Sequence, residues 1–237
     1  MTPETLDRLR TISTASITTL LFKRGFRNVY VQGVLPIAPT EATAPNMVGP
    51  AMTLCYIPAR EDLDQLGAFA DPMHPQRRAV ETAAAGCVLV MDCRGDARVA
   101  SAGEILMTRL KVRGSAGMVT DGGLRDSQPI ARMGFPVFAA KPSAPLNLAQ
   151  HHAVDIDVPI GCGGVAVYPG DVVVGDYDGV VIIPAHLADE VARDGAEQEL
   201  LEAYLLQRIV DGAELPGTYP PSETTRAAFE AWRTKKP

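Results

Sequence analysis

The chain has 237 residues, of which 46% are hydrophobic and 21% are charged. This composition predicts a globular protein with a sizeable core and excludes disordered and collagen-like classes. Lys and Arg number 22 against 28 Asp and Glu, which gives a formal net charge of −6. A general nucleic-acid binder is therefore not expected, because it would need a net basic surface.

The longest apolar runs, at 86–91 and 179–184, have the length of strands. They are far shorter than the ~20 residues of a membrane-spanning helix. Acidic residues stand near the start of the chain, where a secretory signal would be basic and then apolar. We therefore expect a cytoplasmic protein that does not bind membranes. No Cys-x-x-Cys pair occurs, which predicts buried free thiols at Cys55, Cys87, Cys93 and Cys162.

Apolar residues at helical spacing predict one amphipathic helix over residues 4–23, ending at Gly25. A strand is expected at 52–57 and a polar loop at 60–75. Helices and strands then alternate, which predicts a largely parallel sheet with helical crossovers. The expected pairs of helix and strand are 76–85 with 87–92, 103–113 with 116–120, and 127–133 with 136–139.

A loop rich in Ala, Pro and Asn follows, and the pattern then becomes one of hairpins. A long helix from about 185 to 211 and a short helix at 221–234 complete the chain. The sequence shows neither an internal repeat nor a linker, so one α/β domain spanning residues 1–237 is predicted. The short strands expected before the last helices are 164–168, 171–175 and 179–183.

The segment from Ala102 to Asp126 is the most informative for chemistry. A helix of about ten residues beginning at Glu104 covers about 15 Å, and the strand at 116–120 returns over a similar distance. Glu104, Arg125 and Asp126 should therefore converge at the carboxyl ends of parallel strands, where open α/β sheets bind ligands.

The residue types at this edge suit the binding of an oxo acid. A carboxylate beside two glycines suits a hard divalent cation, and Arg125 offers a planar fork for a substrate carboxylate. The free amides of Ile105 and Leu106 at the helix start add a site for an anion. Such a site could polarise a 2-oxo acid and stabilise its enolate.

A purely structural interpretation of the same segment is also open. Asp121 could cap a turn, and Arg125 and Asp126 could form an exposed ion pair. Glu104 could simply stabilise the helix through its dipole. Spacing alone does not decide between this interpretation and a binding site.

A resemblance bears on this choice. Gly103-Glu104, the twenty residues between Glu104 and Arg125, the pair Arg125-Asp126 and the segment 134–138 resemble a known signature. It is that of the family holding the class II 4-hydroxy-4-methyl-2-oxoglutarate/4-carboxy-4-hydroxy-2-oxoadipate aldolases and the regulator of ribonuclease E activity A, the RraA-like proteins. The likeness continues through 169–171 and 175–184 and covers roughly residues 45–210. It implies an α/β fold, a β/β/α sandwich resembling the swivelling phosphohistidine domain, assembled as trimers or hexamers.

The resemblance also implies roles for residues. Asp126 would ligate Mg²⁺ or Mn²⁺, and Arg125 would bind the substrate and stabilise charge on its pyruvyl oxygens. Glu104 stands where the aldolases have an acidic residue that positions a metal-bound water for proton transfer. The remaining substrate-binding positions would be the main chain at Gly103, Ile105 and Leu106.

In the aldolases, a Glu from the last long helix of a neighbouring subunit also serves the site. Alignment of that helix on Arg208 and Gly212 points to Glu199, with Glu202 as the competitor. The family pattern often has an acid three positions after the Asp, where this chain has Pro129. The replacement of this acid by Pro129 could alter a contact near the site, or the surface that the ribonuclease regulators use.

The four histidines are further candidates. His151 and His152 are expected as a surface pair in a loop, and His186 as part of a helix start. His74, in the segment Asp71-Pro-Met-His-Pro75, could belong to a lid over the site.

The sequence thus predicts a divalent-metal-dependent lyase that cleaves a 4-hydroxy-2-oxo (di)carboxylic acid to pyruvate and a second oxo acid. Decarboxylation of oxaloacetate through the same enolate is the expected side activity. Two alternatives stay open: a non-catalytic regulator that binds a ribonuclease, and another metal-dependent lyase or hydratase acting on a sugar-derived 2-oxo acid.

Overall fold

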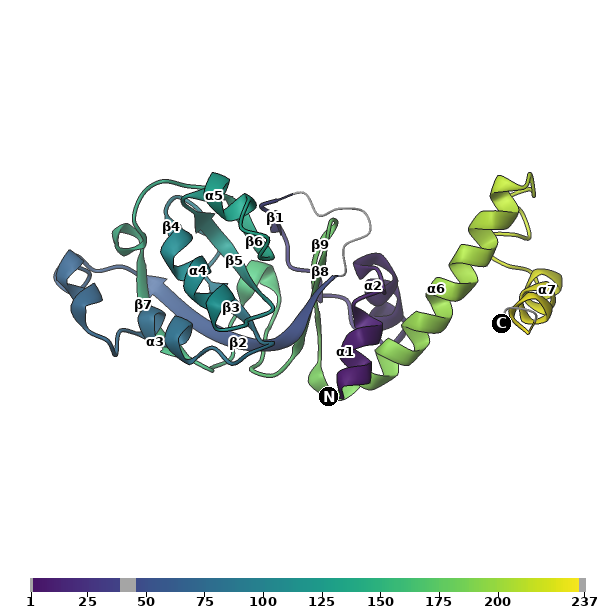
Figure 1. The fold of residues 1–237 in the computed structure, drawn as a ribbon, viewed down its shortest axis with the longest axis horizontal. Coiled ribbons are helices and arrows are strands. Elements are labelled where there is room, and N and C mark those ends of the chain that lie inside the picture. Colours follow the sequence, from purple (N-terminus) through teal and green to yellow (C-terminus); the bar gives the residue numbers. More distant parts are fainter. Residues whose placement is uncertain (1, 39–45, 235–237) are drawn as a thin grey trace.

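The computed structural model describes residues 2–38 and 46–234 (Figure 1). Residues 1, 39–45 and 235–237 of the predicted domain lie outside the described residues. A mixed sheet forms the centre of the body, and helices pack against it. Its strands are β1 (Leu35–Pro36), β2 (Met47–Pro58), β3 (Val88–Asp92), β4 (Ala100–Ala102), β5 (Gly117–Leu124), β6 (Val137–Pro142), β7 (His151–Ile156), β8 (Val172–Asp176) and β9 (Gly179–Ile183).

The order of the main path in the sheet is β1-β6-β5-β3-β2-β8-β9. The pairs β2/β3, β3/β5 and β5/β6 are parallel, and β4 pairs in parallel with β5. The pairs involving β1, β7, β8 and β9 are antiparallel. Because β1 also contacts β9, the sheet is nearly closed and resembles a barrel. The prediction of a largely parallel sheet was therefore right only for the central strands.

Alternation along the central strands separates two cores. On β3, Leu89 and Met91 face a core that also holds Met107 and Leu110 of the helix following β4. Val88 and Val90 face the opposite way, against the β8–β9 hairpin and its neighbours. Successive side chains of a strand point to opposite faces, so β3 is apolar on both.

The helices are named in chain order. Three of them, α3, α4 and α5, belong to the βα units of the central sheet, while α1, α2 and α6 pack together beside the β8–β9 hairpin (Figure 1). None of the described helices has the length and apolar character needed to cross a membrane. The helices are α1 (Pro3–Leu9), α2 (Thr14–Lys23), α3 (Pro75–Thr82), α4 (Glu104–Val112), α5 (Ser127–Ala131), α6 (Ala188–Val210) and α7 (Glu223–Arg233).

The N-terminal segment differs from the single helix predicted over residues 4–23. The chain breaks between α1 and α2, where the Ser13 hydroxyl accepts a hydrogen bond from the Ser16 amide and caps the new helix. Leu9, Ile12 and Ile17 remain buried in one core despite the break. Helical periodicity identified the buried residues correctly but could not reveal the interruption.

The region between β6 and β8 also differs from its prediction. Residues 151–156 form β7, which pairs with β2, so His151 and His152 lie on a strand and not in a loop. His151 is fully buried, which contradicts the expected surface pair. No strand forms over 164–168: a short 3₁₀ helix occupies Cys162–Gly164, and a single bridge joins Ile160 to Val167.

Candidate functional site

The turn from β4 into α4 lies directly against the end of β5. The Arg125 amide donates to the Ala102 carbonyl at 3.1 Å, and the Glu104 amide donates to Oδ2 of Asp126 at 3.2 Å. Nε of Arg125 lies 3.5 Å from the same carboxylate oxygen. The structure thus brings Glu104, Arg125 and Asp126 together, as their spacing predicted.

Gly103 makes this close approach possible. A Cβ at residue 103 would lie 2.6 Å from Oδ2 of Asp126 and 2.8 Å from Nε of Arg125. Because the φ of Gly103 is −143°, its backbone conformation is open to any residue, and what the position requires is space. Asp126 has a φ of 56°, in the left-handed region that Asp and Asn tolerate better than most residues.

The first turn of α4 offers main-chain donors beside these side chains. The Met107 amide bonds to the Gly103 carbonyl, and the Glu104 amide is used by Asp126. The amides of Ile105 and Leu106 have no acceptor among the described residues. Two free N–H groups at a helix N-terminus form a favourable place for a carboxylate.

The donor set near Asp126 suits a weakly held hard cation. Within the described ranges, no group of three or more His, Cys, Asp or Glu side chains could enclose a metal. Asp126 is close to half exposed, and its Oδ1 atom takes no hydrogen bond from the described residues. A single free carboxylate oxygen open to solvent is compatible with Mg²⁺, which often keeps several waters and takes one or two carboxylates.

A pocket of about 600 Å³ opens beside this junction, and Gly103, Ile105, Leu106 and Arg125 line one side of it. Gln76 and Arg77 of α3, with Asn147, line other parts. The sequence analysis missed these three residues. For Gln76 and Arg77 the only signal was their position in the first turn of the helix predicted after Pro75, and for Asn147 it was a place in a loop. Neither position indicates a pocket.

Asp121 lies within β5 and does not cap a turn. Its carboxylate accepts hydrogen bonds from the amides of Cys93 at 2.6 Å, Gly95 at 2.8 Å and Gly163 at 3.0 Å. Burial raises the pKa of this carboxyl, while the three amides act in the opposite direction. Asp121 therefore ties the loop after β3 to the segment before β8, and the capped-turn interpretation is wrong.

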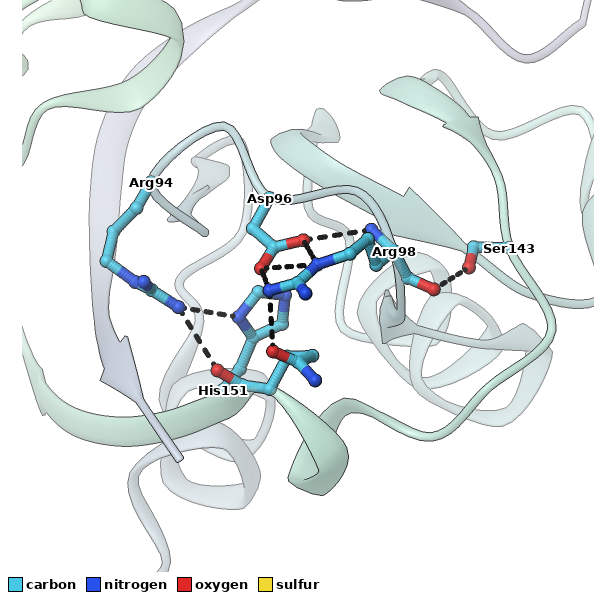
Figure 2. A network of polar contacts seen from close by, with 6 residues as sticks. Arg94, Asp96, Arg98, Ser143 and His151 are labelled. Carbon is cyan, nitrogen blue, oxygen red and sulfur yellow. Dashed lines mark hydrogen bonds and ion pairs between the residues drawn. The ribbon is translucent and has the colours of Figure 1, made fainter. Parts of the chain in front are cut away.

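A second polar network surrounds His151 and reaches Ser143, which lines a hollow together with Arg125 and Asp126 (Figure 2). Arg94 donates to Nδ1 of His151 at 3.3 Å, while Asp96 pairs with Arg98 at 2.6 Å. Burial lowers the pKa of His151, and the nearby Arg94 lowers it further. Ser143 fixes the Arg98 carbonyl at 2.8 Å. The network thus links the loop after β3 to the start of β7 and to the segment that follows β6.

The remaining candidates are Glu199, Glu202 and His74. Glu199 of α6 accepts hydrogen bonds from the amide and hydroxyl of Ser13, both at 3.0 Å, and Glu202 accepts one from Gln198. In Figure 1, α6 lies beyond β8 and β9 from α4, so neither Glu belongs to the Arg125 junction of its own chain. His74 precedes α3 and packs edge-on against Phe69, which lines the pocket.

Comparisons with known proteins identify the family of the chain. A family described as RraA-like, Aldolase/RraA, matches residues 11–182. A Halalkalibacterium halodurans protein named "Putative 4-hydroxy-4-methyl-2-oxoglutarate aldolase" is 35% identical over 52% of this chain and 58% of its own length. The chain thus spans little more than half the length of that relative.

Solved structures match over more of the chain. Streptomyces coelicolor RraAS2, described as an unusual member of the RNase ES inhibitor RraA family, is 29% identical with a TM-score of 0.74, covering 86% of this chain and 96% of that one. An uncharacterised Pseudomonas syringae protein is 23% identical with a TM-score of 0.80, covering 94% and 95%, and shows a shared fold. The chain therefore belongs to the RraA-like family and has its α/β fold with a nearly closed sheet.

Proposed function

We propose that this chain is a divalent-metal-dependent class II aldolase. Its substrate would be a 4-hydroxy-2-oxo (di)carboxylic acid such as 4-hydroxy-4-methyl-2-oxoglutarate, cleaved to pyruvate and an oxo acid. Decarboxylation of oxaloacetate is the expected side activity. The observation that carries the proposal is the junction of Arg125, Asp126 and the first turn of α4, where Arg125 and the start of the helix line a pocket.

The pyruvyl end of the substrate would bind at the start of α4. The free amides of Ile105 and Leu106 can donate to its carboxylate, and the absence of a side chain on Gly103 leaves room beside them. The Arg125 guanidinium, which lines the same wall, would donate to the 2-oxo oxygen and orient the carbonyl.

Asp126 would hold Mg²⁺ or Mn²⁺ through its free oxygen. The cation, when bound, supplies a Lewis acid next to the substrate's 2-oxo group. Asp126 also has a role of its own, because its other oxygen fixes the Glu104 amide and so sets the position of the α4 N-terminus.

Cleavage breaks the bond between C3 and C4 after the C4 hydroxyl loses its proton. The electron pair moves to the 2-oxo oxygen as the pyruvate enolate forms, and Arg125 would stabilise this negative charge. Glu104, whose side chain is exposed, would relay the proton through water. A proton returned to C3 completes pyruvate, and C4 leaves as the carbonyl of the second product.

The test is release of pyruvate, measured by coupling to lactate dehydrogenase with Mg²⁺ or with EDTA. Activity should require the metal and fall by about 100-fold or more in Arg125→Ala and Asp126→Ala. Arg60→Ala and Asp62→Ala remove an exposed ion pair elsewhere and serve as matched controls. Absence of pyruvate release, or its survival in both site variants, would refute the proposal.

We extend the proposal to a homotrimer or homohexamer in which Glu199 completes the site of a neighbouring subunit. The extension is supported by the shape of the chain, since α6 reaches away from the sheet and exposes Leu206 and Val210 near its end (Figure 1). A mixture of inactive Arg125→Ala and Glu199→Ala subunits should regain activity if sites are shared. A parallel mixture with Glu202→Ala distinguishes the two glutamates, and no recovery in either mixture argues against sharing.

A second candidate function is regulation of a ribonuclease by direct binding. It is favoured by the breadth of the match to RraAS2, which covers far more of this chain than the aldolase relative does. A pull-down with an RNase E-type nuclease tests it. Binding that is equal in wild type and Asp126→Ala, with no pyruvate release, would favour this candidate over the aldolase.

A further inference from the structure

Arg77 is a partly buried cation in the pocket wall without an acidic partner. No hydrogen bond or ion pair to its guanidinium occurs within the described residues, although the guanidinium carbon lies 4.2 Å from the centre of the Phe69 ring. Desolvation lowers the pKa of Arg77, Tyr56 acts in the opposite direction, and the charge of Arg125 lowers it. Two guanidiniums thus line one pocket, and the positive charge of Arg125 opposes that of Arg77.

The position of Arg77 on its helix adds to this cost. Arg77 and Arg78 lie in the first turn of α3, which contains no acidic residue. The N-terminus of a helix carries partial positive charge, so a cation there is unfavourable unless an anion is bound. Both the pocket and the helix terminus therefore favour a negatively charged group next to Arg77.

The other charged residues lining the pocket do not meet this need. Glu81 receives three hydrogen bonds from Arg109, at 2.8 to 3.2 Å, so these two charges compensate each other. Gln76 and Asn147 contribute uncharged polar groups. Of the arginines that line the pocket, Arg109 pairs with Glu81 and Arg125 lies 3.5 Å from Asp126, so Arg77 is the one without an acidic partner among the described residues. An anionic group of a ligand would supply that partner.

We propose that Arg77 binds the carboxylate at the far end of a dicarboxylic 2-oxo acid, and that this contact makes the site select dicarboxylates over monocarboxylates. The inference rests on the proposed function for the orientation, in which the pyruvyl end lies at Arg125 and the α4 N-terminus. Phe69 would hold the guanidinium plane for this contact.

The test measures binding by calorimetry with Mg²⁺ present, so that it does not depend on turnover. The probes are 2-oxoglutarate and 2-oxopentanoate, which share a five-carbon chain and differ in the distal carboxylate. Wild type should bind 2-oxoglutarate about tenfold or more tightly than 2-oxopentanoate. Arg77→Gln should abolish this preference by weakening 2-oxoglutarate alone, and Arg77→Lys should retain part of it.

Arg78→Gln is the matched control, because it removes the same charge from the next position of α3, which does not line the pocket and pairs with Asp155, and it should leave the preference within about twofold. Equal weakening of both acids by Arg77→Gln, an unchanged preference, or no binding of either acid by wild type would overturn the inference. If the preference depends on Arg77 but no pyruvate is released, the aldolase proposal is refuted and the role of Arg77 in binding the distal carboxylate stands. If pyruvate is released but the preference does not depend on Arg77, the aldolase proposal stands and the role of Arg77 is refuted.

Discussion

The carboxylate of Asp126 and the main-chain amide of Glu104 are joined by a 3.2 Å hydrogen bond across the turn between β4 and α4. Oδ2 of Asp126 thus positions the N-terminus of α4, and Oδ1 remains available to a ligand. The metal position and the anion position of the proposed site are therefore coupled through one side chain.

Gly103→Ala should inactivate the site without unfolding the protein. The new Cβ would lie 2.6 Å from Oδ2 of Asp126 and 2.8 and 2.9 Å from Nε and Cγ of Arg125. Both side chains are exposed, so they can rotate away with little cost to the fold. Pyruvate release should fall by about 100-fold, because small misplacements of binding groups are costly, while the Tm stays near that of wild type. Gly67→Ala, where a Cβ meets no atom within 4 Å, is the control. Full activity in Gly103→Ala would contradict this packing argument.

Asp126→Asn should separate metal binding from backbone conformation. Asn tolerates the left-handed region as Asp does, so stability should change little. Loss of the carboxylate should weaken Mn²⁺ binding, measured by electron paramagnetic resonance, and lower activity by about 100-fold. Asp157→Asn makes the same change at an exposed residue with a φ of 55°. Unchanged Mn²⁺ affinity in Asp126→Asn would exclude Asp126 as the ligand.

The junction of Glu104, Arg125 and Asp126 was predictable because these residues are close in sequence and are joined by one helix and one strand. A helix and a strand of similar length necessarily bring Glu104 back to Arg125, and the glycine before the helix was part of a recognisable signature. The burial of Leu9, Ile12 and Ile17 was also predictable, because it follows from periodicity.

The parts that the sequence could not predict depend on contacts between distant segments. The Asp121 carboxylate, from the middle of β5, bonds to amides 26 to 42 residues away, and no local pattern distinguishes it from a turn residue. β7 looked like a loop because the segment before it is rich in Ala, Pro and Asn. Arg77 lines the same pocket as Arg125 only because α3 packs beside α4.

Asp121→Asn should destabilise the fold. An Asn side chain presents at most one carbonyl oxygen to three amide donors, and its NH₂ group would face an N–H. Leaving buried donors unsatisfied costs about 2 kcal/mol, which corresponds to a Tm lower by about 4–8 °C for a domain of this size. Asp178→Asn, at an exposed position, is the control. A Tm within about 1 °C of wild type would show that these three hydrogen bonds contribute little.

His151 should make the protein less stable as the pH falls below neutrality. Burial lowers its pKa in the folded state, with Arg94 acting in the same direction (Figure 2). The unfolded chain, with a His pKa near 6.5, then binds a proton that the folded protein does not. Stability should therefore be unaffected by this group above about pH 6.5 and decline below it, until the folded pKa is reached.

The measurement is urea unfolding at pH 7.5 and pH 5.0 for wild type and His151→Gln. At most about 2 kcal/mol of the wild-type decline over this interval can come from one histidine, and His151→Gln should lack that part. The pKa of His74 is also lowered by burial, so part of the decline should persist in the variant. His186→Gln changes an exposed histidine and should behave as wild type. Equal declines in wild type and His151→Gln would show that the buried imidazole is not the group that titrates.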